Sequence, residues 1–266
     1  MISTRRHGPI AVVTIDRPDA LNSLDPSAMV DLRDALAEVR DDDSVRIGIV
    51  TGTGDRAFCT GADLKNTSPP SSSFAEGYFA RDEAAVDHGL YPRSIALGEM
   101  DLRKPMIAAV NGHCLGGGFE MALACDLRVA AESATFGLTE PRWATVPAIG
   151  GISRLLRAVP SALAMRMLLT GERIDAAEAH RIGLVSDLVP VGGALSRALE
   201  LAEQIAANGP LAVRAVHEMA RRSSNLPLDQ SVAIEQLLWG VLRDTADRAE
   251  GRDAFGAKRP PRYEGR

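Results

Sequence analysis

Apolar residues follow two different periods along the first two-thirds of the chain. Short runs rich in β-branched residues at positions 10–15, 47–50 and 106–110 predict strands. Between the first two runs, apolar residues recur at helical spacing, at Ala28, Leu32, Leu36 and Val39. Asp25 is a suitable N-cap for that helix, and Pro26 fits its first turn. Strands alternating with helices indicate an α/β core.

The pattern changes twice later in the chain. In the segment from Asn66 to Lys104, two prolines and four serines at 67–73 break both periods and predict a mobile loop. The aromatic residues that follow are expected to contribute apolar walls to a pocket: Phe74, Tyr78, Phe79 and Tyr91. From about Gly193 onward the pattern is helical only, with apolar stripes at Leu195, Leu199, Ala202 and Ala206, and at Ile234, Leu237, Leu238, Val241 and Leu242.

These patterns predict a main domain at 1–195 and a helical subdomain at 196–266. So small a helical unit can hardly form its own core, so we expect it to pack on the main domain or on another subunit. The whole chain has 266 residues, of which 45% are hydrophobic, enough for one substantial core with such an appendage.

Charge and cysteine content narrow the class of protein. Charged residues make up 24% and the net charge is −5, which does not suggest nucleic acid or a membrane surface as a partner. No apolar run approaches the ~18 residues needed to span a bilayer, and no small-residue cleavage site follows the first apolar run. Three cysteines are an odd number, so we expect reduced thiols and a cytoplasmic location.

The sequence does not fully match the signatures of nucleotide-binding, serine-nucleophile or metal sites. The G-x-G-x-x-A spacing from Gly52 to Ala57 follows a strand as a dinucleotide fingerprint would. That fingerprint needs a helix at its second glycine, whereas 58–61 (F-C-T-G) brings a β-branched residue and another glycine within one turn, which predicts a simple Gly-rich turn. Ser153 lacks the second glycine of a nucleophile elbow, and no histidine pair has metal-ligand spacing, so no metal is expected.

A second group of glycines could form part of a binding site for an anion. Gly116, Gly117 and Gly118 follow the strand at 106–110 and precede Glu120 and a predicted helix. Glycines let the backbone approach a ligand, and the first N–H groups of a helix have no helical partners. Alone, a glycine triplet is more often a turn than an anion site, and a lone glutamate is more often a solvated surface charge.

Four ordered motifs change that interpretation. The segment 57–65 (A-F-C-T-G-A-D-L-K) follows one strand as the glycine triplet follows the next, and 135–140 (T-F-G-L-T-E) precedes 145–151 (T-V-P-A-I-G-G). Together with 17–22, 169–174 and 254–259, they resemble the enoyl-CoA hydratase/isomerase family, the crotonase superfamily, over nearly the whole chain. The resemblance implies a spiral of repeated β-β-α units with a C-terminal helical oligomerisation subdomain, assembled as a homotrimer or a dimer of trimers.

The resemblance also implies an active site. The backbone N–H groups of Ala62 and Gly117 would hold the thioester oxygen and stabilise an enolate. Glu120 would take a proton from a water that attacks C3 of a 2-enoyl-CoA, and Glu140 would deliver one to C2. The expected activity is reversible hydration of an acyl-CoA substrate, with no cofactor beyond its coenzyme A moiety.

Contacts to coenzyme A are implied by the same resemblance. Ala20 and Leu21 would line the pantetheine or adenine end, residues 62–65 would border the adenine, and Lys258 could approach the phosphates from a neighbouring subunit. The expected substrate- and CoA-binding residues are Ala20, Leu21, Gly61, Asp63, Leu64, Lys65, Gly116, Trp143 and Lys258.

The chain departs from the family pattern just after its second glutamate. Pro141, Arg142 and Trp143 stand where hydratases of this type usually carry aliphatic residues. Proline biases the preceding Glu140 toward extended dihedrals, and the indole of Trp143 could narrow the acyl pocket or bind a polar substituent.

Two other functions remain open at this point. An enoyl-CoA isomerase of the family can move a proton with one carboxylate, usually at the position of Glu140, but the presence of Glu120 as well favours hydration. A non-catalytic CoA-binding or RNA-binding member is the other, and the intact glutamate pair and the lack of a basic stripe argue against it.

Overall fold

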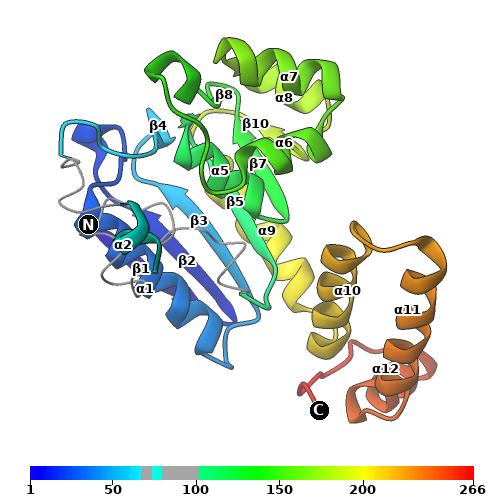
Figure 1. The fold of residues 1–266 in the computed structure, drawn as a ribbon. Coiled ribbons are helices and arrows are strands. Elements are labelled where there is room, and N and C mark those ends of the chain that lie inside the picture. The colour runs from blue at the N-terminus through cyan, green and yellow to red at the C-terminus, as the bar shows by residue number, and fades with distance from the viewer. Residues whose placement is uncertain (67–73, 80–101) are drawn as a thin grey trace.

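The computed structural model describes residues 1–66, 74–79 and 102–266, and Figure 1 shows their arrangement. Its main layer is a six-stranded sheet in which β1 is antiparallel to β2 and all other neighbours are parallel. In spatial order the strands are β1 (Ile2–His7), β2 (Ile10–Ile15), β3 (Ile47–Gly52), β5 (Met106–Val110), β7 (Leu127–Ala131) and β10 (Asp187–Val189).

A four-stranded sheet lies beside the main one. Its strands, in spatial order, are β4 (Ala57–Cys59), β6 (His113–Leu115), β8 (Thr135–Gly137) and β9 (Ile174–Asp175). Consecutive strands go to alternate sheets, β3 then β4, β5 then β6, and β7 then β8, so the chain winds between the two sheets. This is the spiral of β-β-α units that the sequence predicted, and the α/β class is confirmed.

Helices cover both sheets and form the C-terminal part. They are α1 (Pro26–Asp41), α2 (Phe74–Phe79), α5 (Gly117–Ala124), α6 (Gly151–Ala158), α7 (Ser161–Thr170), α8 (Ala176–Arg181), α9 (Ala194–Ala206), α10 (Pro210–Ser223), α11 (Leu228–Arg243) and α12 (Ala246–Gly256). The described residues also include the 3₁₀ turns η1 (Pro18–Ala20) and η3 (Glu140–Trp143). No helix in the described part of the chain is long and apolar enough to cross a membrane.

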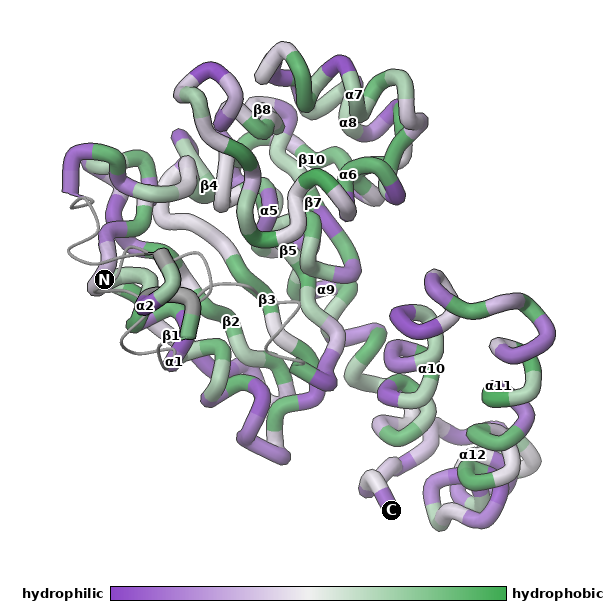
Figure 2. Tube along the Cα trace, in the orientation of Figure 1, coloured by the Kyte–Doolittle hydropathy of each residue, from purple (hydrophilic) through white to green (hydrophobic). Residues whose placement is uncertain are grey.

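The two faces of the main sheet bury different residues, as strand alternation requires. One face packs against α9 through the alternate positions Ile10, Val12, Ile47, Ile49, Ile107, Ala109 and Val129. The helix presents alanines at 194, 198, 202 and 206, whose small side chains let its backbone lie close to the sheet. The opposite face joins α1, α5 and the smaller sheet in the larger core, and Figure 2 shows the apolar strands between these layers.

Helix α1 is capped at both ends by side chains. The Asp25 carboxylate accepts a hydrogen bond from Ala28 N, as the predicted N-cap should. At the other end, the buried Lys104 ammonium donates to the carbonyls of Val39 and Asp42 at 2.7 Å each. Burial lowers the pKa of Lys104, and the nearby positive charge of Arg214 lowers it further.

The Gly-rich segment after β3 is a turn and not the start of a helix, as predicted. Asn22 and Asn111 hold it from both sides, because each side-chain amide donates to Ala57 O, at 2.7 and 2.9 Å. Gly52 N in turn donates to Asn111 Oδ1. These bonds fix the path from β3 into β4 and so the position of the loop that follows β4.

The C-terminal helices α10, α11 and α12 stand apart from the sheets in Figure 1. Arg46 ties this part to the core, since its guanidinium donates to Ala206 O at the end of α9 and to Tyr263 O in the tail. The boundary expected after residue 195 stays a prediction; it falls within α9, which packs on the main sheet. Of the predicted apolar stripe on α11, Leu237 and Val241 are exposed.

The loop expected between Asn66 and Lys104 lies largely outside the described residues. Within it, residues 74–79 form the short helix α2, and Phe79 is exposed. Tyr91 falls outside the described residues. The three cysteines are buried free thiols, and burial raises the pKa of Cys59 to about 12.

Two helical glycines make a matched test of the packing between α5 and β4. A Cβ at Gly118 would lie 2.2 Å from Cys59 O, whereas a Cβ at Gly240 in α11 would meet no described atom within 4 Å. Alanine favours a helix over glycine by ~1 kcal/mol. We therefore expect Gly240→Ala to raise the thermal midpoint by a few degrees and Gly118→Ala to lower it, in thermal unfolding followed by circular dichroism. Equal shifts in the two variants would contradict the close approach of α5 to β4.

Candidate active site

Two glycine-containing loops meet at the carboxyl ends of β4 and β6. Gly61 has a φ of +85°, which disfavours other residues, and a Cβ there would lie 2.9 Å from Gly117 N. Only the absence of a side chain lets the loop after β4 approach the start of α5 so closely. The contact brings the segments carrying Ala62 and Gly117 side by side.

The backbone amides of Ala62 and Gly117 are available in this arrangement. Leu24 fixes the first loop, since Leu24 N donates to Gly61 O and Asp63 N donates to Leu24 O, both at 2.8 Å, which leaves the intervening Ala62 N–H unused. Gly117 is the first residue of α5, so its N–H has no helical acceptor. Neither amide donates to another described residue. Two such donors can stabilise a developing oxyanion, particularly at a helix N-terminus.

Glu120 projects from the first turn of α5 and is buried, with 3% of its surface exposed. Its Oε1 accepts hydrogen bonds from Ile149 N at 2.9 Å and Gly151 N at 2.7 Å. A Cβ at Gly151 would lie 2.8 Å from that same oxygen, so glycine is needed there. The motif at 145–151 thus supplies the amides that hold one oxygen of this carboxylate in a fixed orientation.

The protonation of Glu120 is set by opposing influences. Burial raises its pKa above the ordinary range, while the amides of Gly151 and Ile149 and the charge of Arg154 oppose that rise. Arg154 also donates to Ile149 O at 2.7 Å, so it supports the loop whose amides bind the carboxylate.

Glu140 is less completely buried than Glu120, and its carboxylate is less well satisfied by hydrogen bonds. Its Oε2 is buried and has no hydrogen-bond partner among the described residues, and burial raises its pKa to about 7, with the charge of Glu120 adding to the rise. The expectation that Pro141 would hold Glu140 extended is wrong: Glu140 begins the 3₁₀ turn η3, with Pro141 at a first-turn position. Proline fits the start of a helical turn, where its missing N–H is not needed.

A cavity of about 450 Å³ joins these groups. It is lined by the two glutamates, by the glycine loops and by side chains of mixed polarity: Leu21, Met29, Thr60, Gly61, Ala62, Leu64, His113, Leu115, Gly116, Gly117, Glu120, Thr139, Glu140, Trp143, Thr145, Val146, Ala148 and Arg173. Trp143 and Leu64 are 68% and 66% exposed, so they are placed at its open side.

The structure brings together most of the residues expected at the site. Of those expected to bind substrate, Leu21, Gly61, Leu64, Gly116 and Trp143 line the cavity. Four others are not among its described lining residues: Ala20 in η1, Asp63, Lys65, and Lys258 after α12. Their roles in binding coenzyme A stay predictions.

Asp63 has a clear structural role instead. Its carboxylate accepts hydrogen bonds from Asn66 and Arg17, and the Asn66 amide is the main reason that its pKa lies below the usual range. Arg17 also pairs with Asp25 at 2.7 Å. The three charged groups tie the start of α1 to the loop that contains Ala62.

Several residues at the site escaped sequence reasoning. Asn22 and Asn111 position β4, because both side-chain amides donate to Ala57 O. His113 and Arg173 also line the cavity; His113 Nδ1 is 2.8 Å from Thr135 Oγ1, and the Arg173 side chain runs across Gly137, with Cγ 3.1 Å from where a Cβ would be. No spacing in the sequence indicates that Arg173, directly before β9, would line the cavity.

Comparison with known proteins places this geometry in a family. The family model described as enoyl-CoA hydratase/isomerase matches residues 5–266. An (E)-benzylidenesuccinyl-CoA hydratase from Thauera aromatica is 45% identical over 96% of this chain and 96% of its own, and a carnitinyl-CoA dehydratase from Citrobacter koseri is 38% identical over 98% and 97%. A crystal structure of an enoyl-CoA hydratase from Bacillus anthracis superposes with a TM-score of 0.89, at 37% identity over 100% of this chain and 99% of that one. The chain therefore belongs to the enoyl-CoA hydratase/isomerase family.

Proposed function

We propose that the protein is an enoyl-CoA hydratase that adds water reversibly across the C2–C3 double bond of a 2-enoyl-CoA. The observation that carries this proposal is the pairing of two carboxylates in one cavity with two unused backbone amides. Glu120 is held by amides and Glu140 is desolvated, so their environments favour different protonation states. One base and one acid are what hydration requires.

In the proposed reaction, the thioester oxygen lies between Ala62 N and Gly117 N. Ionised Glu120 takes a proton from a water whose oxygen bonds to C3, and the electrons of the double bond move onto the thioester oxygen as an enolate. The two amides stabilise that charge, and one such donor is typically worth ~3–4 kcal/mol of barrier. Protonated Glu140 then delivers its proton to C2, and exchange with solvent restores both carboxyl groups.

Substitution of each glutamate by glutamine separates the two roles. Glutamine keeps the size and hydrogen-bonding capacity but removes the base, so a loss of ~10²–10⁴-fold is the expected scale. Glu120→Gln should nearly abolish hydration of crotonyl-CoA while leaving some exchange of the C2 proton in a saturated or hydrated acyl-CoA. Glu140→Gln should impair both. Hydration is followed by the loss of conjugated-thioester absorbance and exchange by deuterium incorporation.

Binding of a product analogue is the control, since neither change touches the two backbone amides. Near-normal hydration by the Glu120→Gln variant would contradict the two-glutamate mechanism. In that case, an isomerase that moves a proton with Glu140 alone would explain the site better than a hydratase.

The pH dependence of hydration should be bell-shaped. Glu140 must be protonated to donate, and its pKa is about 7, so kcat/KM should fall as the pH rises above that value, approaching tenfold per pH unit. Glu120 must be ionised, so the rate should also fall at low pH, as the pH drops through its raised pKa. The residual activity of Glu140→Gln should lack the alkaline limb; an alkaline limb that persists there would assign it to another group.

We further propose that the acyl group carries a ring and a carboxylate. The similar hydratase from Thauera aromatica acts, by its name, on benzylidenesuccinyl-CoA, whose acyl group has both. Trp143 could stack on a ring at the open side of the cavity, and Arg173 is the only arginine among its described lining residues. A guanidinium binds a carboxylate through paired, charge-assisted hydrogen bonds.

Replacing Arg173 tests this substrate class apart from the chemistry. Arg173→Gln should lower kcat/KM for benzylidenesuccinyl-CoA tenfold or more, because a charge-assisted bond is worth ~1.5–3 kcal/mol, and should leave crotonyl-CoA within about twofold. Arg157→Gln in α6, which lies outside the cavity lining, is the matched control. Equal losses on both substrates would rule out a carboxylate contact and leave the hydration mechanism standing.

We also propose that the chain forms a homotrimer or a dimer of trimers through its C-terminal helices. Exposed apolar side chains on α11, including Leu237, Trp239 and Val241, support this. Analytical ultracentrifugation that finds a stable monomer at micromolar concentration would contradict it.

A further inference from the structure

One face of the four-stranded sheet forms a wall of the cavity that holds the two glutamates. Cys114 and Phe136, at the middle of β6 and β8, are buried in the core. Side chains alternate along a strand, so the residues on either side of these two face away from that core. His113 and Leu115 are the residues of this kind on β6, and both line the cavity. A ligand in the cavity therefore contacts this face of the sheet.

His113 is held in one orientation by the neighbouring strand. Thr135 lies directly opposite it on β8, and His113 Nδ1 is 2.8 Å from Thr135 Oγ1. This is a hydrogen-bond distance, so the hydroxyl group occupies one of the two ring nitrogens. The other nitrogen, Nε2, has no hydrogen-bond partner among the described residues. The half-buried imidazole therefore keeps one polar atom for a ligand.

Arg173, an exposed residue directly before β9, lies across β8 on the same side of the sheet. A Cβ at Gly137 would lie 3.1 Å from Arg173 Cγ, so the arginine side chain occupies the space that a side chain at 137 would fill. Gly137 is two residues along β8 from Thr135, a separation of ~6.6 Å. A carboxylate that accepts a ~2.9 Å hydrogen bond at each oxygen can bridge such a gap.

The positive charge of Arg173 is not neutralised by the described residues around it. Its acidic neighbour Glu172 is paired with Arg166. The influences on the pKa of Glu140 are its burial, a backbone hydrogen bond and the charge of Glu120, so Arg173 is not its counter-ion. Arg173 makes no ion pair or hydrogen bond with any residue in the described part of the chain. Its guanidinium is therefore available to an anionic group in the cavity.

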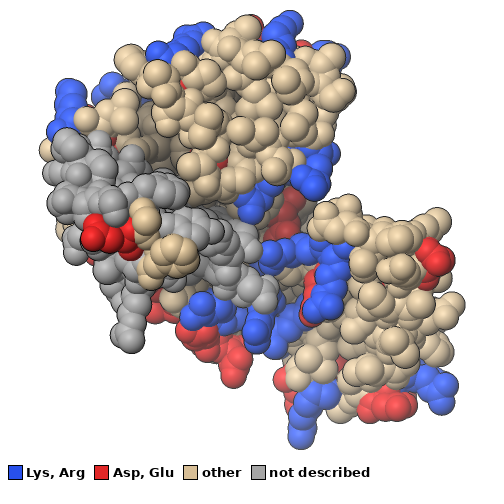
Figure 3. Space-filling model, viewed as in Figure 1, with Lys and Arg blue, Asp and Glu red and all other residues tan. Residues whose placement is uncertain are grey.

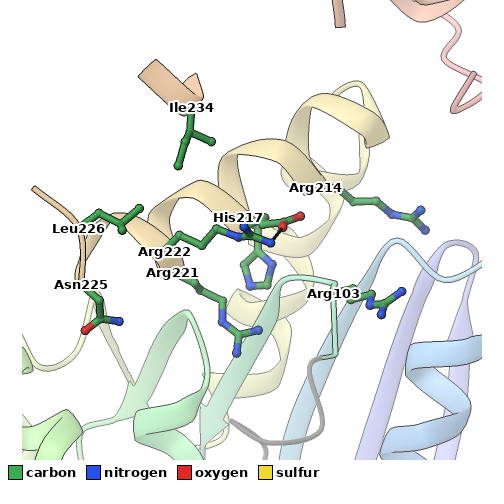
Figure 4. A pocket seen from close by; sticks show the side chains of 9 residues that line it. Arg103, Arg214, His217, Arg221, Arg222, Asn225, Leu226 and Ile234 are labelled. Carbon is green, nitrogen blue, oxygen red and sulfur yellow. Dashed lines mark ion pairs between the residues drawn. The ribbon is translucent and has the colours of Figure 1, made fainter. Parts of the chain in front are cut away.

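A larger cavity beside α10, of about 790 Å³, does not offer its charge in this way. Figure 4 shows the arginines that line it, and a dashed line marks the ion pair between Arg222 and Glu218. Arg103 and Arg221 also have interaction partners. Figure 3 shows that the surface over η3, α6 and α7 is mostly uncharged, with Lys and Arg along its edges. Arg173 thus differs from the arginines beside α10, whose charge the protein itself engages.

We propose that His113, oriented by Thr135, binds the carboxylate of the acyl group together with Arg173 and so selects substrates that carry a carboxylate. A hydroxyl that donates to Nδ1 leaves the ring proton on Nε2, which then donates to one carboxylate oxygen while the guanidinium donates to the other. Two donors fixed in this way discriminate against an acyl group without acceptors, because they stay unpaired beside it. The proposal rests on the proposed function only in taking the acyl group of a CoA thioester as the ligand.

Calorimetric titration of the full-length protein with two saturated thioesters tests this without turnover. Benzylsuccinyl-CoA carries a ring and a carboxylate, and 3-phenylpropionyl-CoA carries the ring alone. The wild type should bind the first roughly tenfold more tightly or better, and His113→Phe should reduce that ratio to about twofold or less. His113→Gln, whose amide can donate near the position of Nε2, should keep most of the ratio. His180→Phe on the exposed side of α8 is the matched control and should leave the ratio unchanged.

Two further variants separate orientation from packing. Thr135→Val removes the hydroxyl but keeps the shape of the side chain, so the ratio should fall about threefold, and Thr135→Ser should restore it. His113→Phe combined with Arg173→Gln should lose less than the product of the two single losses, because both side chains bind the same group.

A wild-type ratio near one would overturn the proposal. So would a ratio that His113→Phe leaves unchanged, or losses that simply multiply in the double variant. Hydration of crotonyl-CoA by the wild type is scored separately. A wild type that prefers benzylsuccinyl-CoA but hydrates nothing would contradict the proposed reaction and leave the carboxylate subsite standing, whereas hydration with a ratio near one would do the reverse.

Discussion

The close backbone approach between Gly61 and Gly117, the first residue of α5, is the constraint on which the candidate active site depends. A single methyl group at Gly61 would lie 2.9 Å from Gly117 N and push the two loops apart. The two amides would then no longer converge, and no side chain could replace them, because their geometry belongs to the backbone. Other bonds hold the chain on either side of this contact. The amides of Asn22 and Asn111 fix β4, and the ion pairs of Arg17 fix the loop that contains Ala62.

Burial does different things to the two glutamates because their hydrogen-bonding environments differ. The Glu120 carboxylate accepts hydrogen bonds from two backbone amides and lies near the positive charge of Arg154. Both interactions stabilise its ionised form and oppose the effect of burial. Glu140 gains no partner for Oε2 among the described residues, and its pKa rises to about 7. One cavity therefore holds two chemically identical side chains in different electrostatic environments, and the glycine at 151 admits the amides that create the difference.

Much of this could be predicted from the sequence where local rules decide. The Asp25-Pro26 helix start, the strands at 10–15, 47–50 and 106–110, and the alanine and leucine face of α9 all follow from spacing. The family, and with it the pair of glutamates, came from ordered motifs. Residue spacing did not predict features that depend on contacts between distant segments, such as Arg173 lining the cavity and Lys104 capping α1. It also did not predict that Glu140 and Pro141 form a 3₁₀ turn, in which Glu140 is not extended.

The short linker between α9 and α10 determines how the C-terminal helices are oriented against the main domain. Helix α9 is docked on the sheet by its alanines up to Ala206, and only residues 207–209 separate it from α10, which begins at Pro210. Fourteen residues of helix extend ~21 Å, so a rotation of ~10° at Gly209 displaces the far end of α10 by ~4 Å. Any such rotation would have to break the hydrogen bonds that Arg46 donates to Ala206 O at the end of α9 and to Tyr263 O in the C-terminal tail, so these two bonds restrain the orientation of α10.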